Sequence, residues 1–422
     1  MRIKRTIPPA ASPIYIRDIL NGLKGFIRGK SEIERFRSEL KNYFGVRHVF
    51  LFSSGKAALT SVLLGLHDLH PGRNTVLIPA FCCYSVPSAI LRAGLEIRLC
   101  DVDPDTLDFD FGLLEKAVSE TATHSVGGDA GTFQPRGSRL LAILPVHLFG
   151  LAADVERVRR LGVDPEVTVI EDAAQVMGAE VGGRKLGTIG DVGFFSLGRG
   201  KALSTVEGGV IVTNRDDIAE AIVQRLNKVP CSGPVEVFRQ LALAAGISVF
   251  QHPALFGIPK SIPFLRLGDT IFDPGFEVRK LSAFQAGIAR GWRDRLAGFS
   301  DARRRTGAQW ERLKLPAVFG RFFSMDGLQP TYVRYPIRVR DRAAWVALLK
   351  TSQANGLGVM LTYPEPVHRI PQLKWHFVGQ EYAAAARMSL EILSLPVHPL
   401  LSDRDRQRIE ALILSVSSCP PH

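Results

Sequence analysis

Short apolar runs alternate with amphipathic segments along the first half of the chain. The runs are rich in β-branched and aromatic residues and span four to six positions, which is typical of strands buried on both faces. This order, from residue 48 to residue 225, predicts an α/β fold with a mostly parallel, doubly wound sheet. The predicted strands are His48–Phe52, Val76–Pro79, Ala142–Val146, Val167–Ile170, Val192–Leu197 and Val210–Thr213.

The N-terminal part of the chain departs from this pattern. Residues 1–30 contain two proline groups followed by an amphipathic piece, and we interpret them as an N-terminal arm. Ser31, followed by Glu34, fits a capping box, which predicts a helix that begins there and continues to Phe44.

The C-terminal part is predicted to be a separate, smaller domain. A long helix over about 281–313 connects a large domain, residues 31–280, to an α+β domain, residues 314–422. The pattern in this smaller domain predicts strands at 332–339 and 358–361 and helices at about 342–354 and 403–415.

An atypical apolar insertion occupies about 228–272 of the large domain. Residues 240–259 contain no Lys, Arg, Asp or Glu, but polar residues and prolines interrupt the run before it reaches the roughly 20 apolar residues that cross a bilayer. A membrane span is therefore excluded. Three alternatives remain, namely a buried helix, part of a dimer interface and a membrane-surface segment. The pattern favours burial.

Composition and charge narrow the classes of partner. Of the 422 residues, 46% are hydrophobic and 22% charged, as in a folded protein with a sizeable core. The net charge of +12 raises the question of a polyanion, yet the basic residues are scattered. The densest group, Arg303 to Arg305, falls in a helical stretch without a nucleic-acid-binding pattern. We therefore exclude nucleic acid and expect an anionic small substrate.

Cysteine usage and the N-terminus indicate the compartment. The five cysteines are odd in number and show no CxxC spacing, which argues against a disulfide framework and against a zinc site. The acidic turn at 101–112 lacks the glycine and the final glutamate of a calcium loop. Met1 to Arg5 is basic, but no apolar core of a signal peptide follows. We predict a cytoplasmic protein without a metal site.

Chemically reactive side chains follow two of the predicted strands. Glu171 and Asp172 end one strand, and Lys201 lies in a glycine-rich loop after the next. In an open α/β sheet, such side chains can project into one crevice beyond the strand ends. Pyridoxal phosphate chemistry needs this pair, because an amine forms a Schiff base with the cofactor aldehyde and a carboxylate keeps the pyridine nitrogen protonated.

The same residues also allow simpler interpretations. A lone lysine in such a loop is usually a solvated surface charge, and a lone Asp after a strand usually makes a cap or turn. A nucleotide phosphate loop is excluded, because Phe195 stands where that motif needs glycine and Ala202 where it needs Ser or Thr.

The order of short motifs around Lys201 is more specific. EDAAQ (171–175), GD-x-x-FFS (190–196), a lysine five residues later and EGGVIVTN (207–214) resemble the DegT/DnrJ/StrS family of sugar aminotransferases. The resemblance implies a fold-type-I enzyme that uses pyridoxal 5′-phosphate and forms a homodimer with sites shared between subunits. It also implies that Lys201 is the catalytic Schiff-base lysine and that Asp172 pairs with the pyridine nitrogen.

The same resemblance assigns further residues around the cofactor. Gln175 is implied to lie near the phenolic oxygen and Ser196 near the phosphate. Ser54, Gly55 and Lys56 form a strand-to-helix turn, whose free N–H groups also suit a phosphate. Tyr84 is a candidate to stack on the ring, and His147, Arg199 and His368 are candidates for the substrate side. A structural hydrogen-bonding role is the favoured alternative for His147 and an equal alternative for His368.

Three positions depart from the family pattern. Lys56 replaces a threonine of the phosphate turn, and Cys83 stands where an aromatic residue stacks on the ring, so that Tyr84 or Phe81 is left to supply it. Glu277 replaces an asparagine that reaches the neighbouring subunit's cofactor phosphate. A carboxylate facing a phosphate is repelled, so we expect that contact to be lost or rearranged.

The resemblance implies a transfer of an amino group from a donor, glutamate, to a nucleotide-linked keto-sugar. The product belongs to the biosynthesis of cell-surface polysaccharides or secondary-metabolite sugars. Two alternatives stay open: a different pyridoxal-dependent reaction, such as that of a lyase or dehydratase, and a cofactor-binding regulatory protein without turnover. Lys201 argues against the dehydratase branch, in which histidine replaces the lysine.

Overall fold

The computed structural model describes residues 5–123, 139–161, 164–262, 265 and 267–416. In this part of the chain, seven strands form a central sheet in the order β1-β9-β8-β5-β4-β2-β3. The five strands from β8 to β3 in this order are parallel, whereas β9 runs antiparallel to both β8 and β1. The predicted α/β fold with a mostly parallel sheet is confirmed. The strands are β1 (His48–Phe52), β2 (Thr75–Pro79), β3 (Glu96–Cys100), β4 (Leu140–Ile143), β5 (Thr168–Asp172), β8 (Val192–Ser196) and β9 (Gly209–Thr213).

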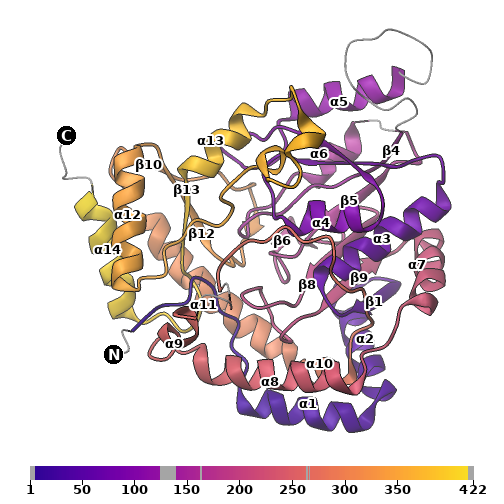
Figure 1. Cartoon of the computed structure of the whole chain (residues 1–422), viewed down its shortest axis with the longest axis horizontal. Helices are drawn as coiled ribbons and strands as arrows, with labels where there is room; N and C mark the ends of the chain where they lie inside the picture. Colours follow the sequence, from indigo (N-terminus) through magenta and orange to yellow (C-terminus); the bar gives the residue numbers. More distant parts are fainter. Residues whose placement is uncertain (1–4, 124–138, 162–163, 263–264, 266, 417–422) are drawn as a thin grey trace.

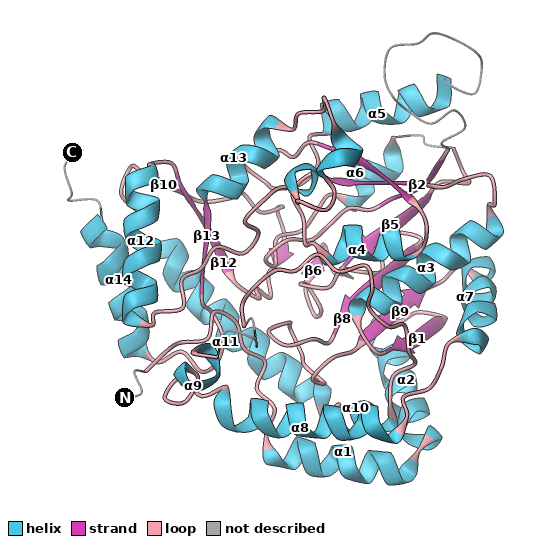
Figure 2. Cartoon of the chain, in the orientation of Figure 1, coloured by secondary structure: helices cyan, strands magenta, loops and turns pink. Residues whose placement is uncertain are grey.

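Helices cover both faces of this sheet (Figure 2). Successive residues of a strand point to opposite faces, so Phe50 packs in the core on one side and its neighbour Leu51 in the core on the other. The first core is covered by α3 (Gly55–Leu69), α4 (Ser85–Arg92) and α7 (Asp216–Lys228), and the second by α2 (Lys30–Phe44), α5 (Phe111–Thr123) and α6 (Val155–Arg160).

The start of α2 differs from the prediction. The helix begins directly after Gly29, whose φ of +59° favours glycine. The Ser31 hydroxyl donates to the carbonyl of Arg28, while the Glu34 side chain pairs with an arginine one turn later. The predicted capping box at Ser31 is therefore wrong, because a turn at Gly29 after α1 (Ile16–Arg28) sets the start of α2.

The predicted long helix over 281–313 is two helices, α10 (Ala283–Ile288) and α11 (Trp292–Arg312). Gly291, with a φ of +65°, interrupts it. A capping box does occur here, since Ser282 and Gln285 exchange side-chain to backbone hydrogen bonds. α11 contacts both the central sheet's helices and the C-terminal part of the chain: Trp292 packs against a ring of α2, and the indole of Trp310 donates to the carbonyl of Pro396 at 3.2 Å.

The C-terminal domain is built on a small antiparallel sheet. Its helices are α12 (Arg342–Asn355), α13 (Ala383–Glu391) and α14 (Asp403–Val416), and its strands are β10 (Phe319–Gly320), β12 (Tyr335–Val339) and β13 (Ile392–Leu395). Two of the helices and one strand match predicted elements. The strand predicted at 358–361 is reduced to a single bridge between Met360 and Ser394. Three two-residue strands, β6 (Glu180–Val181), β7 (Arg184–Lys185) and β11 (Leu328–Gln329), form a third sheet.

The apolar insertion forms a helix with an exposed outer face. α8 (Pro234–Phe250) lies beside α1 along one edge of the molecule (Figure 1). Within α8, Gln240 and Ala244 are buried, but Val235 and Phe238 are 85% and 72% exposed. The burial predicted for residues 240–259 is confirmed in part, because Leu241, Leu243 and Ile247 pack against a small buried cluster, whereas Val249 is 52% exposed. In the ranges described above, no helix is long and apolar enough to cross a membrane.

α1 packs against α10 through glycine. A Cβ added at Gly25 would lie 2.6 Å from the carbonyl oxygen of Ala283 and 2.7 Å from the Cα of Gly287. Because the small residues face inward, the large apolar side chains of α1 point outward. Together with two residues of α8 they form a surface that we call the apolar edge: Ile16, Leu20, Leu23, Phe26, Ile27, Val235 and Phe238.

Candidate active site

Asp172 ends β5, in the middle of the sheet. Its backbone N–H donates to the carbonyl of Pro145 at 3.0 Å, and its carbonyl accepts from the N–H of His147 at 3.1 Å. The side chain is buried, and one carboxylate oxygen accepts from the N–H of Ala174 at 3.0 Å. Burial raises the pKa of Asp172, and the positive charge of Lys201 opposes this rise. A carboxylate in such a place is stabilised by a cationic partner.

The neighbouring carboxylate, Glu171, points to the other face of the sheet and is structural. Its oxygens accept backbone N–H bonds from Gly187 at 2.7 Å, from Gly190 at 2.5 Å and from Ile189. Of the two carboxylates that end β5, only Asp172 is therefore available for catalysis.

His147 is tied to Glu171 and is structural as well. Its Nε2 lies 3.2 Å from the Glu171 carboxylate, and its Nδ1 accepts from the N–H of Ala153 at 3.0 Å. The side chain is fully buried, and both nitrogens are engaged. The predicted contact of His147 with substrate is therefore corrected: the residue has no free donor or acceptor, and it fixes the end of β5 instead.

Lys201 follows β8 in a loop that depends on Gly200, whose φ is +72°. The lysine is half-buried, and its charge acts on Asp172. Its carbonyl is held from outside the loop, by the hydroxyl of Ser12 and by the guanidinium of Arg303 at 2.7 Å. The structure thus brings the two predicted catalytic residues, Lys201 and Asp172, into electrostatic range of each other.

The start of α3 and Ser196 form the predicted phosphate cradle. Ser54 caps the helix by accepting from the N–H of Ala57 at 3.1 Å. A Cβ added at Gly55 would lie 2.9 Å from the Cβ of Ser196, so only glycine lets the helix start approach this serine. Free N–H groups at a helix start and a serine hydroxyl are donors that suit a phosphate.

Lys56 is turned away from this cradle. Its ammonium lies 3.3 Å from the carboxylate of Asp273 and 4.3 Å from the centre of the Phe276 ring. The lysine therefore ties α3 to the segment at 273–276 within the single chain. A phosphate contact of Lys56 stays a prediction.

Gln175 and Tyr84 contact the segment between α12 and α13. Gln175 accepts from the N–H of Phe149 and donates to the hydroxyl of Tyr363, both at 3.1 Å. The Tyr84 hydroxyl donates to the carbonyl of Glu365 at 2.8 Å and accepts from its N–H at 2.9 Å. These contacts fix where both side chains lie; their roles beside a cofactor stay predictions.

Three other predicted residues lie around this centre without direct contacts to it. Arg199 is exposed in the Lys201 loop, and Glu277 is exposed and paired with Arg279 at 2.8 Å. His368 is buried, with its ring 5.0 Å from that of Tyr382, and within the described residues neither of its ring nitrogens has a hydrogen-bond partner. Burial lowers the pKa of His368.

Two arginines at this centre were missed by the sequence analysis. Arg303 was treated only as part of a basic group, yet it is fully buried and holds the Lys201 loop. Arg334, just before β12, lies within electrostatic range of Cys83 and Tyr363. Arg334 falls within the strand predicted at 332–339, but no motif in the sequence distinguishes it from the other residues of that strand.

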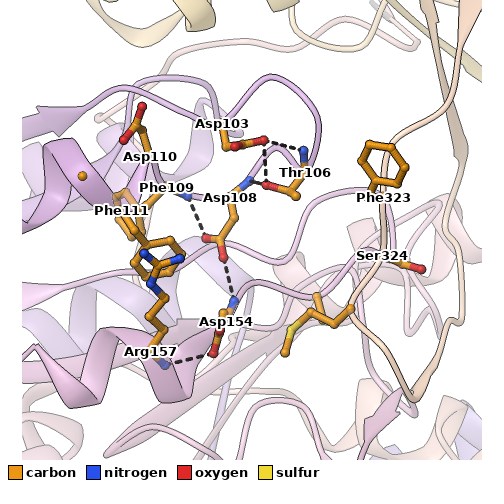
Figure 3. Close-up of a pocket in the computed structure, with 13 residues that line it drawn as sticks. Asp103, Thr106, Asp108, Phe109, Asp110, Phe111, Asp154, Arg157, Phe323 and Ser324 are labelled. Atoms are coloured by element: carbon orange, nitrogen blue, oxygen red, sulfur yellow. Dashed lines mark hydrogen bonds between the residues drawn. The ribbon is translucent and has the colours of Figure 1, made fainter.

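A separate pocket of about 410 Å³ lies away from these residues (Figure 3). It is lined by Asp103, Thr106, Asp108, Asp110, Asp154 and Arg157, among others, and contains none of the predicted site residues. Burial raises the pKa of Asp108 to about 6. The Asp103 carboxylate accepts from the N–H groups of Asp105 and Thr106, as in an ordinary turn. Across the described ranges, no group of three or more His, Cys, Asp or Glu side chains is placed to hold a metal.

Comparison with known proteins identifies the fold family of this site. Residues 15–413 match the model of the DegT/DnrJ/EryC1/StrS aminotransferase family. The chain belongs to this family. This aminotransferase is 27% identical over 384 residues to the UDP-N-acetyl-3-dehydro-alpha-D-glucosamine 3-aminotransferase of Acidithiobacillus ferrooxidans, covering 89% of this chain and 86% of that protein. It is 26% identical over 382 residues to a protein of Geobacillus stearothermophilus named pleiotropic regulatory protein, covering 89% and 87%.

Solved structures agree with this assignment. A DegT DnrJ EryC1 StrS aminotransferase from Brucella abortus is 25% identical and superposes with a TM-score of 0.68, covering 92% of this chain and 91% of that one. The predicted family and enzyme class are confirmed.

The described residues of this aminotransferase fit the family's cofactor, pyridoxal 5′-phosphate. Asp172 is a buried carboxylate without a cation in direct contact, which suits a protonated ring nitrogen. The cradle at Gly55 and Ser196 suits the phosphate, and Lys201 supplies the amine. The chain therefore offers a partner for each reactive part of the cofactor.

Proposed function

We propose that this enzyme moves an amino group from glutamate to a nucleotide-linked keto-sugar, in the biosynthesis of cell-surface polysaccharides or secondary-metabolite sugars. The observation that carries the proposal is the buried Asp172 carboxylate with the Lys201 amine in its electrostatic range. The relative from Acidithiobacillus ferrooxidans, whose name describes a nucleotide-sugar aminotransferase, supports the substrate class.

The chain's own residues define the chemistry. Pyridoxal phosphate, when bound, supplies an electron-accepting ring that stabilises negative charge at the carbon being deprotonated. Asp172 would hold the proton on the ring nitrogen and keep the ring cationic. The donors at the start of α3 and the Ser196 hydroxyl would hold the phosphate and so orient the cofactor.

Lys201 acts twice. Its amine would hold the cofactor, and the same amine is the base that would accept a proton from the α-carbon of the amino donor. A nearby cationic ring lowers the pKa of an amine, which suits proton transfer near neutral pH. Ser12 and Arg303 hold the lysine's carbonyl, so the amine returns to the same place in each half-reaction.

A visible absorption spectrum tests the proposal. Purified protein with pyridoxal phosphate should show the visible band of lysine-bound cofactor, and glutamate should bleach it. Lys201→Ala should lack the band while remaining folded by circular dichroism, and Lys228→Ala, an exposed lysine of α7, should behave as wild type. A band that no amino acid bleaches would reject the aminotransferase assignment in favour of another pyridoxal-dependent reaction or a regulatory protein.

We also propose that a second copy of the chain covers the apolar edge. Seven large apolar side chains are exposed on two helices that contact each other, which favours an interaction site over ordinary exposure. A homodimer is the assembly that the family resemblance implies, and isologous contact would bury the edge of both copies.

Light scattering tests the homodimer. Phe26→Gln combined with Phe238→Gln should shift the protein from dimer to monomer, whereas Val223→Gln, at an exposed valine of α7, should not. If the double variant stays dimeric but the wild type alone sediments with anionic lipid vesicles, the edge is a membrane-surface site and this proposal is wrong.

We further propose that the enzyme works in the cytoplasm. Cys82, Cys83, Cys100 and Cys231 are free thiols, as is typical of proteins in a reducing compartment. Cell fractionation with an antibody to the chain should recover it in the fraction that contains soluble enzymes. Recovery with an extracytoplasmic fraction would contradict this placement.

A further inference from the structure

Arg334 carries a positive charge without an anionic partner. The residue comes directly before β12, and its Nε is enclosed without a hydrogen-bond partner. Among the described residues, its one hydrogen-bond contact is with the Thr362 hydroxyl, 3.5 Å from Nη1, at the limit of bonding distance. No carboxylate of the described chain lies within ion-pair distance of it.

Other enclosed arginines of the chain are compensated. Arg338, four residues on, pairs with Glu391 at 2.5 Å and with Asp105 at 3.1 Å. Arg295 pairs with Asp18 at 3.0 Å. Arg303 donates instead to several backbone carbonyls. A desolvated charge that lacks such compensation is costly, so its presence at Arg334 indicates an anion that binds from outside the chain.

Arg334 is placed beside the candidate active site. It lies within electrostatic range of the Cys83 thiol and of the Tyr363 hydroxyl. Tyr363 accepts a hydrogen bond from Gln175 and is also in electrostatic range of Asp172. The residue as a whole is only partly buried. Burial lowers the pKa of Arg334, but the group stays cationic at neutral pH.

We propose that Arg334 binds the α-carboxylate of the amino donor. A planar guanidinium offers two parallel N–H donors that match the two oxygens of a carboxylate. One cation balances one carboxylate, whereas the diphosphate of a nucleotide sugar carries at least two charges. The inference rests on the proposed aminotransferase function and names the residue that selects amino acids as donors.

Two donors that differ in a single group test the assignment. 4-Aminobutyrate is glutamate without its α-carboxylate. The donor half-reaction is monitored by the loss of the visible cofactor band. Arg334→Met should lower its kcat/KM about 10- to 100-fold for glutamate and less than about twofold for 4-aminobutyrate. Arg334→Lys, which keeps the charge but loses the paired donors, should fall between wild type and Arg334→Met. An equal loss for both donors, or no loss for either, would overturn the proposal.

A matched control and a binding measurement separate this result from misfolding and from failure of the proposed function. Arg340→Met removes an exposed arginine just after the same strand and should behave as wild type. Glutarate, an unreactive dicarboxylate, should raise the unfolding temperature of wild type and Arg340→Met but not of Arg334→Met, whether or not any turnover occurs. If glutamate bleaches no band but the stabilisation by glutarate still depends on Arg334, the aminotransferase assignment is wrong and the anion site is retained. If glutarate stabilises all variants equally, the anion site fails.

A carboxylate on the sugar is the other possible source of the anion. UDP-glucuronate and UDP-glucose differ by one carboxylate, and titration calorimetry compares their affinities for wild type and Arg334→Met. The proposal expects no preference that depends on Arg334. Arg334→Met could instead lose a preference for UDP-glucuronate and still discriminate between glutamate and 4-aminobutyrate as wild type does. That result would assign the arginine to the acceptor and overturn the donor assignment.

Discussion

The guanidinium of Arg303 donates to the carbonyl of Lys201 at 2.7 Å. The same arginine donates to the carbonyls of Ala202 at 2.9 Å and Ala11 at 3.0 Å. A single fully buried side chain of α11 therefore joins the catalytic loop to the N-terminal segment. Burial lowers the pKa of Arg303 to about 10, so the group remains cationic at neutral pH. Arg303 is a positioning residue, because it acts on the amine through the backbone of Lys201.

Replacing Arg303 should loosen the Lys201 loop. Arg303→Met leaves several buried carbonyls without donors, and we expect the free energy of unfolding to fall by about 3–5 kcal/mol in urea. Where the variant folds, the pH titration of the visible cofactor band should shift relative to wild type, because the lysine amine is no longer held in one place. A purely structural role would lower stability without moving that titration.

Arg304 provides the matched control. It is the next residue of α11, but its side chain is 38% exposed and forms an ion pair with Asp301 one turn earlier. Arg304→Met should change the free energy of unfolding by less than about 0.5 kcal/mol and leave the spectrum unchanged. Equal losses for Arg303→Met and Arg304→Met would show that the buried contacts contribute little.

The sequence indicates the burial of Arg303 but not its partners. Trp292, Leu296, Phe299, Arg303 and Trp310 fall on one helical face, and that face is buried. Helical spacing thus placed an arginine among core residues, but its partners are about 100 and 290 positions away. Local periodicity carries no information about such distant contacts.

The same limit explains which parts of the site were predicted. The strands and the motifs between 171 and 214 are local, so Asp172 and Lys201 could be found from their spacing. The structural role of His147 rests on Glu171, and the orientation of Glu171 depends on N–H groups near residue 190, so only the fold shows these contacts. The outer face of α8 could not be assigned, because an apolar segment does not reveal whether its own chain or another surface covers it.

Asp172 and Glu171 should respond differently to the loss of charge. Asp172→Asn keeps the size of the side chain but cannot hold a cationic ring nitrogen, so we expect activity to fall about 100-fold or more while the apoprotein stays as stable as wild type. Glu171→Gln can no longer accept all its backbone N–H groups, and should lower the free energy of unfolding by about 1–3 kcal/mol. Steady-state rates and urea unfolding of both variants test the contrast. A fully active Asp172→Asn would remove Asp172 from the ring nitrogen.

Glycine at position 25 should be required by the packing of α1 on α10. A methyl group at Gly25 would lie 2.6 Å from the carbonyl of Ala283, so the two helices would have to separate. We expect Gly25→Ala to lower the free energy of unfolding by about 1–3 kcal/mol. Gly298→Ala, at an exposed position within α11 with no atom within 4 Å, should instead raise it by about 0.5–1 kcal/mol. Chemical denaturation of the two variants tests the pair, and stabilisation of both would mean that α1 has room to adjust.

His398 should make the N-terminal segment sensitive to acid. Its Nε2 donates to the carbonyl of Pro8 at 2.7 Å, and burial lowers its pKa to about 4. The unfolded chain binds this proton near pH 6.5 and the folded chain only near pH 4. The contribution of His398 to the free energy of unfolding is therefore fully present above about pH 6.5 and is lost as the pH falls between these values. The loss is about 2 kcal/mol at pH 5. His398→Gln should lose about 2 kcal/mol less than wild type between pH 7.5 and pH 5, measured by urea unfolding. Since Pro8 leads to Ser12, which holds the Lys201 carbonyl, the visible cofactor band should weaken in the same pH window in wild type only. An identical pH dependence in both proteins would place the acid-sensitive group elsewhere.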